Sequence, residues 1–217
     1  MGERSGAEAK LRNLRPKQKL ILTFPTSTFK KMSSVDLSRF SNAGFDRGAS
    51  RLKEALWTLV RCLFFAPALP WPSAIRVFWL RLFGAKIGRG MIIRSRVNIH
   101  FPWRLEVGDH VWIGEECWLL NLAPIVIENH VCLSQRAFLC TGNHDFTSPT
   151  FELVVKSIHV ETGAWIGAAS FVGPGVCVAS HALLTAGSVA TTDLKQFTIY
   201  RGNPASAIKD RIVKSKT

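Results

Sequence analysis

The sequence predicts an all-β solenoid of the parallel β-helix type, and two repeating features carry the prediction. An aliphatic residue returns at every sixth position of one long stretch: Val160, Ile166, Val172, Val178, Leu184 and the weaker Ala190. Four positions after each anchor stands a small residue or a valine. A period of six fits neither a helix nor ordinary strand alternation, but it fits a triangular coil with one hexapeptide on each face. The anchor would point into the coil, and the small residue would fill the remaining interior.

The same register recurs upstream. Its anchors are Ile87, Ile93 and Ile99, then Val107, Ile113, Leu119 and Ile125, and, after a slip of two residues, Ile127, Leu133 and Leu139. A sandwich whose strands recur at short spacing is the alternative. The number of anchors in phased blocks favours a β-helix over residues 86–194.

Length and composition limit the possible classes of protein. The 217 residues suffice for one solenoid with flanking elements. The five cysteines show neither a CxxC pair nor a zinc spacing, and no secretory signal is evident, so we expect a cytoplasmic protein. Residues 1–100 hold 19 Lys/Arg against 5 Asp/Glu, whereas residues 101–217 hold 9 against 10. No nucleic-acid-binding motif accompanies the basic half, which therefore favours a membrane surface over nucleic acid as its partner.

Residues 1–50 are predicted to be a basic N-terminal extension with little regular structure up to about residue 31. Met32 opens a more ordered segment and is predicted to be the natural start.

Residues 51–85 are predicted to form a pair of helices. The first, over 52–65, has a wide apolar face made by Leu56, Trp57, Leu59, Val60, Leu63 and Phe64, and prolines end it. The second is predicted over 74–83, with Ser73 as its N-cap. The uncharged run between them is too short and too rich in proline to span a bilayer. Two compatible roles remain open: a cap on the end of the solenoid, or an amphipathic segment lying peripherally on the inner membrane surface.

Residues 140–159 interrupt the six-residue register, so an inserted loop is predicted there. Loops inserted into a regular scaffold often carry the functional residues. After the last anchor, residues 195–217 are predicted to contain a short helix over 205–212, with Asn203 as cap and Pro204 at its first position, followed by a tail.

Several motifs together resemble the hexapeptide-repeat acyltransferases. They are the coils, the loop Thr-Gly-Asn-His-Asp-Phe (141–146), Ala-Trp-Ile-Gly (164–167) and the closing Gly-Asn-Pro-Ala (202–205). Within that group the sequence most resembles the colanic acid biosynthesis acetyltransferases, over about residues 33–213. Non-enzymatic solenoids share the coils, so the loop and the closing motif carry the inference of an enzyme.

The resemblance implies a left-handed β-helix, a homotrimer with active sites between neighbouring prisms, acetyl-CoA as donor, and direct transfer to a hydroxyl. His144 matches the catalytic histidine of this family. An imidazole, with an ordinary pKa near 6.5, can take the proton of a sugar hydroxyl at neutral pH while the hydroxyl attacks the thioester. A loop histidine that only bonds to its own turn is the alternative.

The resemblance also places residues around the two substrates. Asn121 and Asp145 are expected at the acceptor; a corner asparagine and a solvated carboxylate are the alternatives. Trp165, Ala168 and Ala186 are expected along the pantetheine arm of acetyl-CoA.

The phosphate end of the donor is expected near Thr191 and Thr192, where this family usually has a Thr-Lys pair. Because the lysine is absent, Lys209 and Arg211, or else Lys195 or Arg201, would have to supply the positive charge. The sequence contains neither an HExxH motif nor a cluster of Cys and His residues, so no metal site is predicted.

We therefore predict an O-acetyltransferase that moves acetyl from acetyl-CoA to a sugar hydroxyl during exopolysaccharide or glycoconjugate synthesis. Two rivals are an acetyltransferase for another small acceptor, such as serine or an antibiotic, and a non-catalytic β-helix scaffold.

Overall fold

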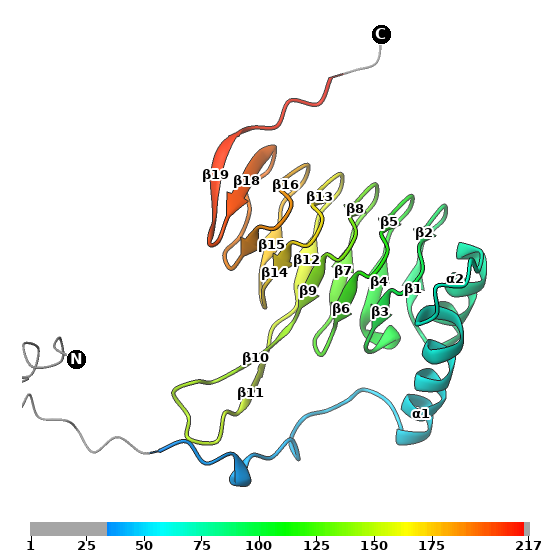
Figure 1. Ribbon diagram of the computed structural model, residues 1–217, viewed down its shortest axis with the longest axis vertical. Coiled ribbons are helices and arrows are strands. Elements are labelled where there is room, and N and C mark those ends of the chain that lie inside the picture. Colours follow the sequence, from blue (N-terminus) through cyan, green and yellow to red (C-terminus); the bar gives the residue numbers. More distant parts are fainter. Residues whose placement is uncertain (1–33, 215–217) are drawn as a thin grey trace, which may run out of the picture. The chain divides into compact units, whose positions relative to one another are not determined.

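Three parallel β-sheets form the faces of a solenoid in the computed structural model, which describes residues 34–214 (Figure 1). Sheet A consists of β1 (Lys86–Ile87), β4 (Leu105–Val107), β7 (Ile125–Ile127), β12 (Ile158–Val160) and β15 (Cys177–Val178). Sheet B consists of β2 (Ile92–Ile93), β5 (Trp112–Ile113), β8 (Cys132–Leu133), β13 (Trp165–Ile166), β16 (Leu183–Leu184), β18 (Thr198–Gly202) and β19 (Ala205–Asp210). Sheet C consists of β3 (Asn98–Ile99), β6 (Trp118–Leu120), β9 (Phe138–Cys140), β14 (Phe171–Val172) and β17 (Val189–Ala190). The predictions about residues up to 31 and about Met32 lie outside the described residues.

Successive coils stack with their anchors in register. Ile93 pairs with Ile113 and Ile113 with Leu133, a spacing of 20 residues, whereas Ile166 and Leu184 pair at a spacing of 18. The two-residue slip in the sequence pattern is therefore the extra length of the earlier coils. The insertion between β9 and β12 separates the two groups of coils.

The predicted anchors fill the interior of the solenoid. Those that are completely buried include Ile99, Ile113, Leu119, Ile125, Leu139, Val160, Ile166, Val172, Val178 and Leu184. The small positions are buried beside them, as Cys117, Ala137 and Ala182 show. Large and small residues thus alternate along the coil and together fill its narrow interior.

Helices α1 (Arg51–Val60) and α2 (Ser73–Leu82) close the end of the solenoid that begins with β1 (Figure 1). A π-helical turn, η2 (Arg61–Phe65), continues α1. Trp57 is buried in the same core as the first coil, and its indole N–H donates to the carbonyl of Ile99 at 3.0 Å. Phe65 and Leu80 are also fully buried there, so the inner face of the helices covers the open end of the core.

A buried arginine holds the proline-rich connection against α2. Arg76 is 2% exposed, and its guanidinium donates to the carbonyls of Phe64, Leu69 and Trp71 at 2.9, 3.0 and 2.7 Å. Burial lowers the pKa of this guanidinium. Carbonyl oxygens thus take the place of a counter-ion.

Two predictions about helix ends are wrong. Ser73 is the first residue of α2 rather than its N-cap, and its hydroxyl instead exchanges hydrogen bonds with the backbone of Ile93. Residues 205–210 form β19, an edge strand antiparallel to β18, rather than part of a helix. Gly202 makes the reversal with a φ of 105°, which favours glycine. The edge of β18 offers unpaired backbone groups, and pairing with them outweighs the local helix signal.

Candidate active site

A two-stranded arm carries the histidine that the sequence singled out. Strands β10 (Gly142–His144) and β11 (Leu153–Val155) pair antiparallel, with His144 opposite Leu153. They leave the solenoid directly after β9 of sheet C and project away from it (Figure 1). Since the two strands satisfy each other's backbone groups, residues can extend beyond the coil without unpaired amides.

The imidazole of His144 is exposed and held in one orientation. Its Nδ1 lies 2.6 Å from the carbonyl oxygen of Phe151. A carbonyl can only accept a hydrogen bond, so Nδ1 carries the proton of the neutral ring and Nε2 keeps its lone pair. The bond to its own arm therefore leaves the second nitrogen ready to take a proton.

Two phenylalanines fix this arrangement. Phe151 has a φ of 50°, a left-handed conformation that costs a non-glycine residue about 1–2 kcal/mol. Phe40, next to the short turn η1 (Leu37–Arg39), meets the His144 ring edge-on with 5.7 Å between centroids. The Asp36 amide donates to the Pro149 carbonyl at 2.8 Å, so the segment before α1 lies along the arm. Sequence reasoning missed both phenylalanines, because only the fold brings Phe40 to the arm.

The two predicted acceptor residues lie in different environments. Asp145 is half-buried, and its carboxylate accepts from the hydroxyl and the amide of Thr147, which lower the pKa of Asp145. Asn121 is fully buried; its Oδ1 accepts from the Phe101 amide at 2.8 Å, and its Nδ2 donates to the Phe101 carbonyl at 2.6 Å. Asn121 thus braces a corner between two coils, and an acceptor contact of this residue stays a prediction.

A column of backbone amides follows the corner between sheets B and C. Its members stand two positions after the inward anchor of each coil: Ser95, Glu115, Gln135, Ala168 and Ala186. Within residues 34–214, none of these amides has a hydrogen-bond acceptor. Ser95, Glu115 and Ala168 are half-buried, whereas Gln135 and Ala186 are exposed. Half-buried backbone donors normally find partners, so a row of free ones along one corner is suited to an extended ligand. We call this row the amide column.

The corner between sheets A and B is closed by its own side chains. The Glu128 carboxylate accepts from the amide of Thr162 at 3.0 Å, and Glu161 accepts from the amide of Ser180 at 2.8 Å. Both carboxylates also accept from the hydroxyls of the same two residues, and these bonds are the largest cause of the lowered pKa of each. The equivalent positions in the amide column have no such partner.

The predicted donor-binding residues form a line along sheet B and its corner. The Gly187 amide donates to the Ala168 carbonyl at 2.8 Å, so Ala168 and Ala186 occupy adjacent coils. Trp165 is 43% exposed on β13, and its indole donates to Ser134. Strand register connects Trp165 to Leu183, then to Ile199 and to Lys209. Lys209 is therefore three strands from Trp165, about 14 Å at the usual strand spacing.

The two basic residues predicted to bind the phosphate end of acetyl-CoA, Arg211 and Lys209, lie in different environments. Arg211 donates to the carbonyls of Gly163, His181 and Ala182 at 3.0, 3.1 and 3.3 Å, and burial lowers its pKa. Lys209 is exposed on β19, as is Arg201 on β18, and neither forms an ion pair with another described residue.

Thr191 lies beside the arm. It lines a groove of about 330 Å³ with Gly142, Lys156 and Phe171, at the base of β10. Thr192 follows it and is exposed.

The described part of the chain contains one group of potential metal ligands. Donor atoms of His159, Glu161 and Cys177 lie within 4.8 Å of one another on the sheet A side. Glu161 is already bonded to Ser180, and burial is the largest cause of the raised pKa of the Cys177 thiol. Neighbouring groups thus account for the cluster without an ion.

Comparisons with known proteins agree with this architecture. No family model matches the chain. An Escherichia coli (strain K12) protein named "Putative colanic acid biosynthesis acetyltransferase WcaF" is 38% identical over 181 residues, which cover 82% of this chain and 97% of that protein. The hexapeptide-repeat acetyltransferase VCA0836 of Vibrio cholerae O1 biovar eltor, solved with acetyl-CoA, superimposes with a TM-score of 0.69 and 22% identity over 76% of this chain and 92% of its own. A galactoside acetyltransferase solved with coenzyme A gives a TM-score of 0.67 and 17% identity, over 74% and 82% of the two chains.

The solenoid and these likenesses define the class, which is that of the left-handed β-helix, hexapeptide-repeat acetyltransferases. The chain belongs to the family of colanic acid biosynthesis acetyltransferases that includes WcaF. The predicted fold class and the prediction of an acyltransferase are confirmed.

Proposed function

We propose that this protein is an O-acetyltransferase that transfers acetyl from acetyl-CoA to a hydroxyl of a sugar, in the assembly of an exopolysaccharide or another glycoconjugate. The observation that carries the proposal is the orientation of His144: Nδ1 is committed to the Phe151 carbonyl, so Nε2 is the proton acceptor. The sugar acceptor is supported by the family, and by sugar acetyltransferases among proteins of the same fold.

The reaction proceeds in one transfer step with a tetrahedral intermediate. The acceptor hydroxyl oxygen attacks the thioester carbonyl while His144 Nε2 removes the hydroxyl proton. The intermediate collapses by breaking the carbon–sulfur bond. The imidazolium then gives its proton to the departing thiolate, so the histidine returns to its neutral form and no acyl-enzyme is formed. The Phe151 carbonyl stabilises the imidazolium by accepting the Nδ1 hydrogen throughout.

Acetyl-CoA would lie along the amide column. The free amides of Ala168 and Ala186 would donate to the amide oxygens of the pantetheine arm, and the exposed face of Trp165 would pack beside it. Lys209 and Arg201 would meet the 3′-phosphate, because Arg211 is occupied by three backbone carbonyls.

A homotrimer completes the site in this proposal. The arm leaves its own solenoid at the corner after sheet C, whereas the amide column follows the corner before sheet C. The arm projects outward (Figure 1), so His144 of one subunit would reach the amide column of a neighbour.

The test is turnover of acetyl-CoA with a panel of free and lipid-linked sugars, followed by analysis of the product. We expect release of the thiol only with a sugar acceptor, and a product whose acetyl group is lost in mild base, as an ester is. Turnover with serine or an antibiotic but with no sugar would overturn the sugar assignment. Absence of acetyl-CoA binding would overturn the enzymatic assignment.

A further inference from the structure

The outer face of the helical cap is a continuous apolar stripe. Leu52, Leu56, Leu59 and Leu63 are 69%, 48%, 56% and 52% exposed, at the spacing of one helix face. Between them the same face carries only small or uncharged residues, Ala55, Cys62 and Ala66, which are also exposed. The sequence assigns Leu56, Leu59 and Leu63 to the same wide face as Trp57 and Val60, but the structure divides that face into a buried half and an exposed half.

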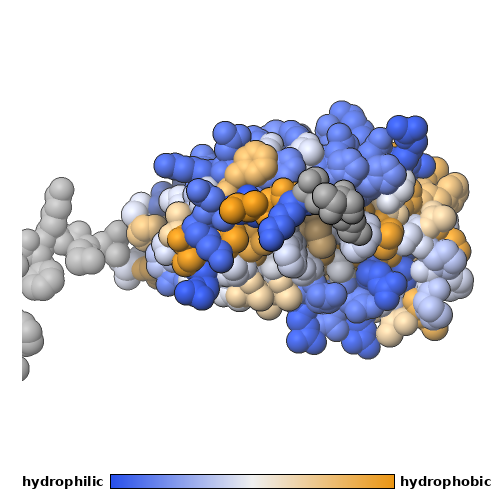
Figure 2. Space-filling view, turned by 90° about the horizontal axis from the view of Figure 1, so that it is seen from above, coloured by the Kyte–Doolittle hydropathy of each residue, from blue (hydrophilic) through white to orange (hydrophobic). Residues whose placement is uncertain are grey.

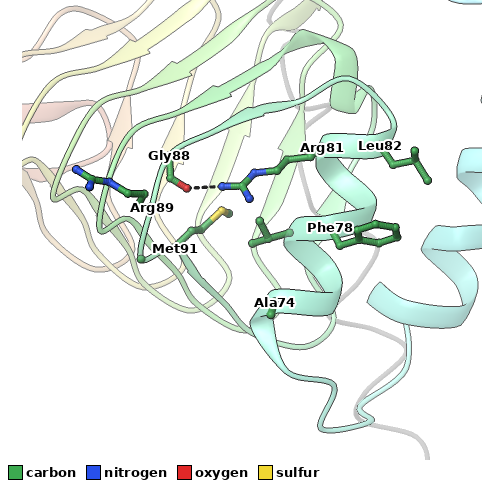
Figure 3. Close-up of a pocket in the computed structure, with 9 residues that line it drawn as sticks. Ala74, Phe78, Arg81, Leu82, Gly88, Arg89 and Met91 are labelled. Atoms are coloured by element: carbon green, nitrogen blue, oxygen red, sulfur yellow. Dashed lines mark hydrogen bonds between the residues drawn. The ribbon is translucent and has the colours of Figure 1, made fainter.

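Helix α2 adds two large apolar side chains to the exposed half. Phe78 and Leu82 are 59% and 61% exposed. Both line a groove of about 620 Å³ between α2 and the first coil, and Met91 lies on its far side (Figure 3). The Arg81 guanidinium crosses the groove and donates to the carbonyls of Ile87 and Gly88 at 2.9 and 2.8 Å. Figure 2 shows apolar side chains at the end of the molecule where the two helices lie.

The charges around this surface have one sign. Between Glu54 and Glu106 the sequence contains no acidic residue and eight basic ones. Arg51, Arg61 and Arg81, which flank the exposed apolar residues, form no ion pair among residues 34–214. Arg61 and Arg81 donate only to uncharged acceptors, the Asn98 side chain and the carbonyls of Ile87 and Gly88. An apolar face bordered by cations without counter-ions is complementary to a surface that is apolar inside and anionic outside.

We propose that this surface, the cap surface, docks the protein on an anionic lipid bilayer. Helix α1 has 10 residues and η2 has 5, which together make about 22 Å of helix. No described helix is long and apolar enough to cross a membrane. The stripe therefore lies in the plane of the interface, with the leucines among the acyl chains and the arginines at the phosphates. Docking on the bilayer would bring the active site close to a lipid-linked sugar. This last step rests on the proposed function, whereas the docking itself does not.

The experiment is flotation of the full-length protein with vesicles of phosphatidylcholine, with or without one part in three of phosphatidylglycerol. The test variant is Leu56→Gln/Leu59→Gln. The matched control is Ile212→Gln/Val213→Gln, because these two side chains are 80% and 59% exposed near the other end of the chain. Binding needs neither acetyl-CoA nor an acceptor, so its failure is distinguishable from failure of the proposed reaction.

We expect binding to the anionic vesicles only, a partition coefficient at least about tenfold lower for the test variant, and an unchanged value for the control. Equal binding to both vesicle types, or equal binding by both variants, would overturn the proposal. Loss of oligomeric mass in the test variant, measured by light scattering, would mean that a second copy covers the stripe instead. Unaltered binding by the test variant together with loss of binding on deletion of residues 1–33 would assign the contact to that segment.

Discussion

In the proposed reaction, the position of a single carbonyl decides which nitrogen of His144 would act as the base. Phe151 supplies that carbonyl from a left-handed conformation, φ 50°, which a glycine adopts readily and a β-branched residue avoids. The proposed role of His144 therefore depends on the backbone conformation of Phe151 more than on the Phe151 side chain.

Substitution of Phe151 tests this dependence. Phe151→Gly retains the favoured backbone conformation, so we expect kcat to stay within about threefold of the wild type. Phe151→Val disfavours it, and we expect kcat to fall by about tenfold or more with little change in KM for acetyl-CoA. Steady-state kinetics measure both values. An equal loss in the two variants would show that the side chain, rather than the carbonyl, matters.

Charge at the far end of the amide column provides a second prediction at this scale. Arg201→Gln/Lys209→Gln should raise KM for acetyl-CoA by about tenfold or more but leave KM for the 3′-dephospho analogue unchanged, because that analogue lacks the phosphate that the cations would meet. The ratio of the two KM values is the measurement. Arg201→Lys/Lys209→Arg is the charge-preserving control. A parallel rise for both donors would mean that the cations support structure instead.

How far the sequence could identify individual residues depended on the kind of signal. The sequence singled out His144 because its motif resembles that of a known family, and its catalytic role stays a prediction. Phe40 was not singled out, since no local pattern relates it to a residue about 100 positions away. Asn121 shows what a motif leaves open: its place suggested a ligand contact, which stays a prediction, whereas only the structure shows that its side chain is buried on the backbone of Phe101.

The coils illustrate how tightly the elements are constrained. A Cβ on Gly167 would lie 2.5 Å from the amide nitrogen of Ala186 in the next coil. A Cβ on Gly187 would meet nothing within 4 Å, although its φ of 69° is unfavourable for other residues. Gly167 is therefore required by the close spacing between coils, and Gly187 only by the backbone conformation of its turn.

The two glycines give a matched pair of stability predictions. We expect Gly167→Ala to destabilise by about 2–3 kcal/mol, because backbone must move. Gly187→Ala should cost about 1 kcal/mol from its backbone conformation alone. Thermal melting monitored by circular dichroism should show the larger decrease in Tm for Gly167→Ala. A reversed order would mean that the coils separate easily.

The elements with a strong repeating pattern in the sequence were the ones predicted correctly. Six-residue spacing predicted the coils because each inward position demands an aliphatic side chain. The C-terminal strand β19 was mistaken for a helix because it pairs with the edge of β18, which is not visible in residues 205–212. Likewise, periodicity could not tell which half of the α1 face would be buried.

The proposed reaction requires a site shared between subunits. Subunits of His144→Ala would lack the proposed base, and subunits of Ala186→Trp would have a blocked amide column. Co-expressed in equal amounts, they should recover about a quarter of the wild-type activity, because one in four interfaces then combines an intact arm with an intact column. Each variant alone should be inactive. No recovery from mixed trimers would place the arm and the column of one chain in the same site.

The most direct test of the central claim is the rate of acetyl transfer from acetyl-CoA to a sugar by wild type and by His144→Ala. Circular dichroism and light scattering would first establish that the variant keeps its fold and its mass. We expect a fall in kcat of about 10²–10⁴-fold with KM for acetyl-CoA nearly unchanged, since in the proposed reaction His144 acts on the acceptor proton and not on the donor. Turnover that survives the substitution would contradict it and would assign the base to another residue.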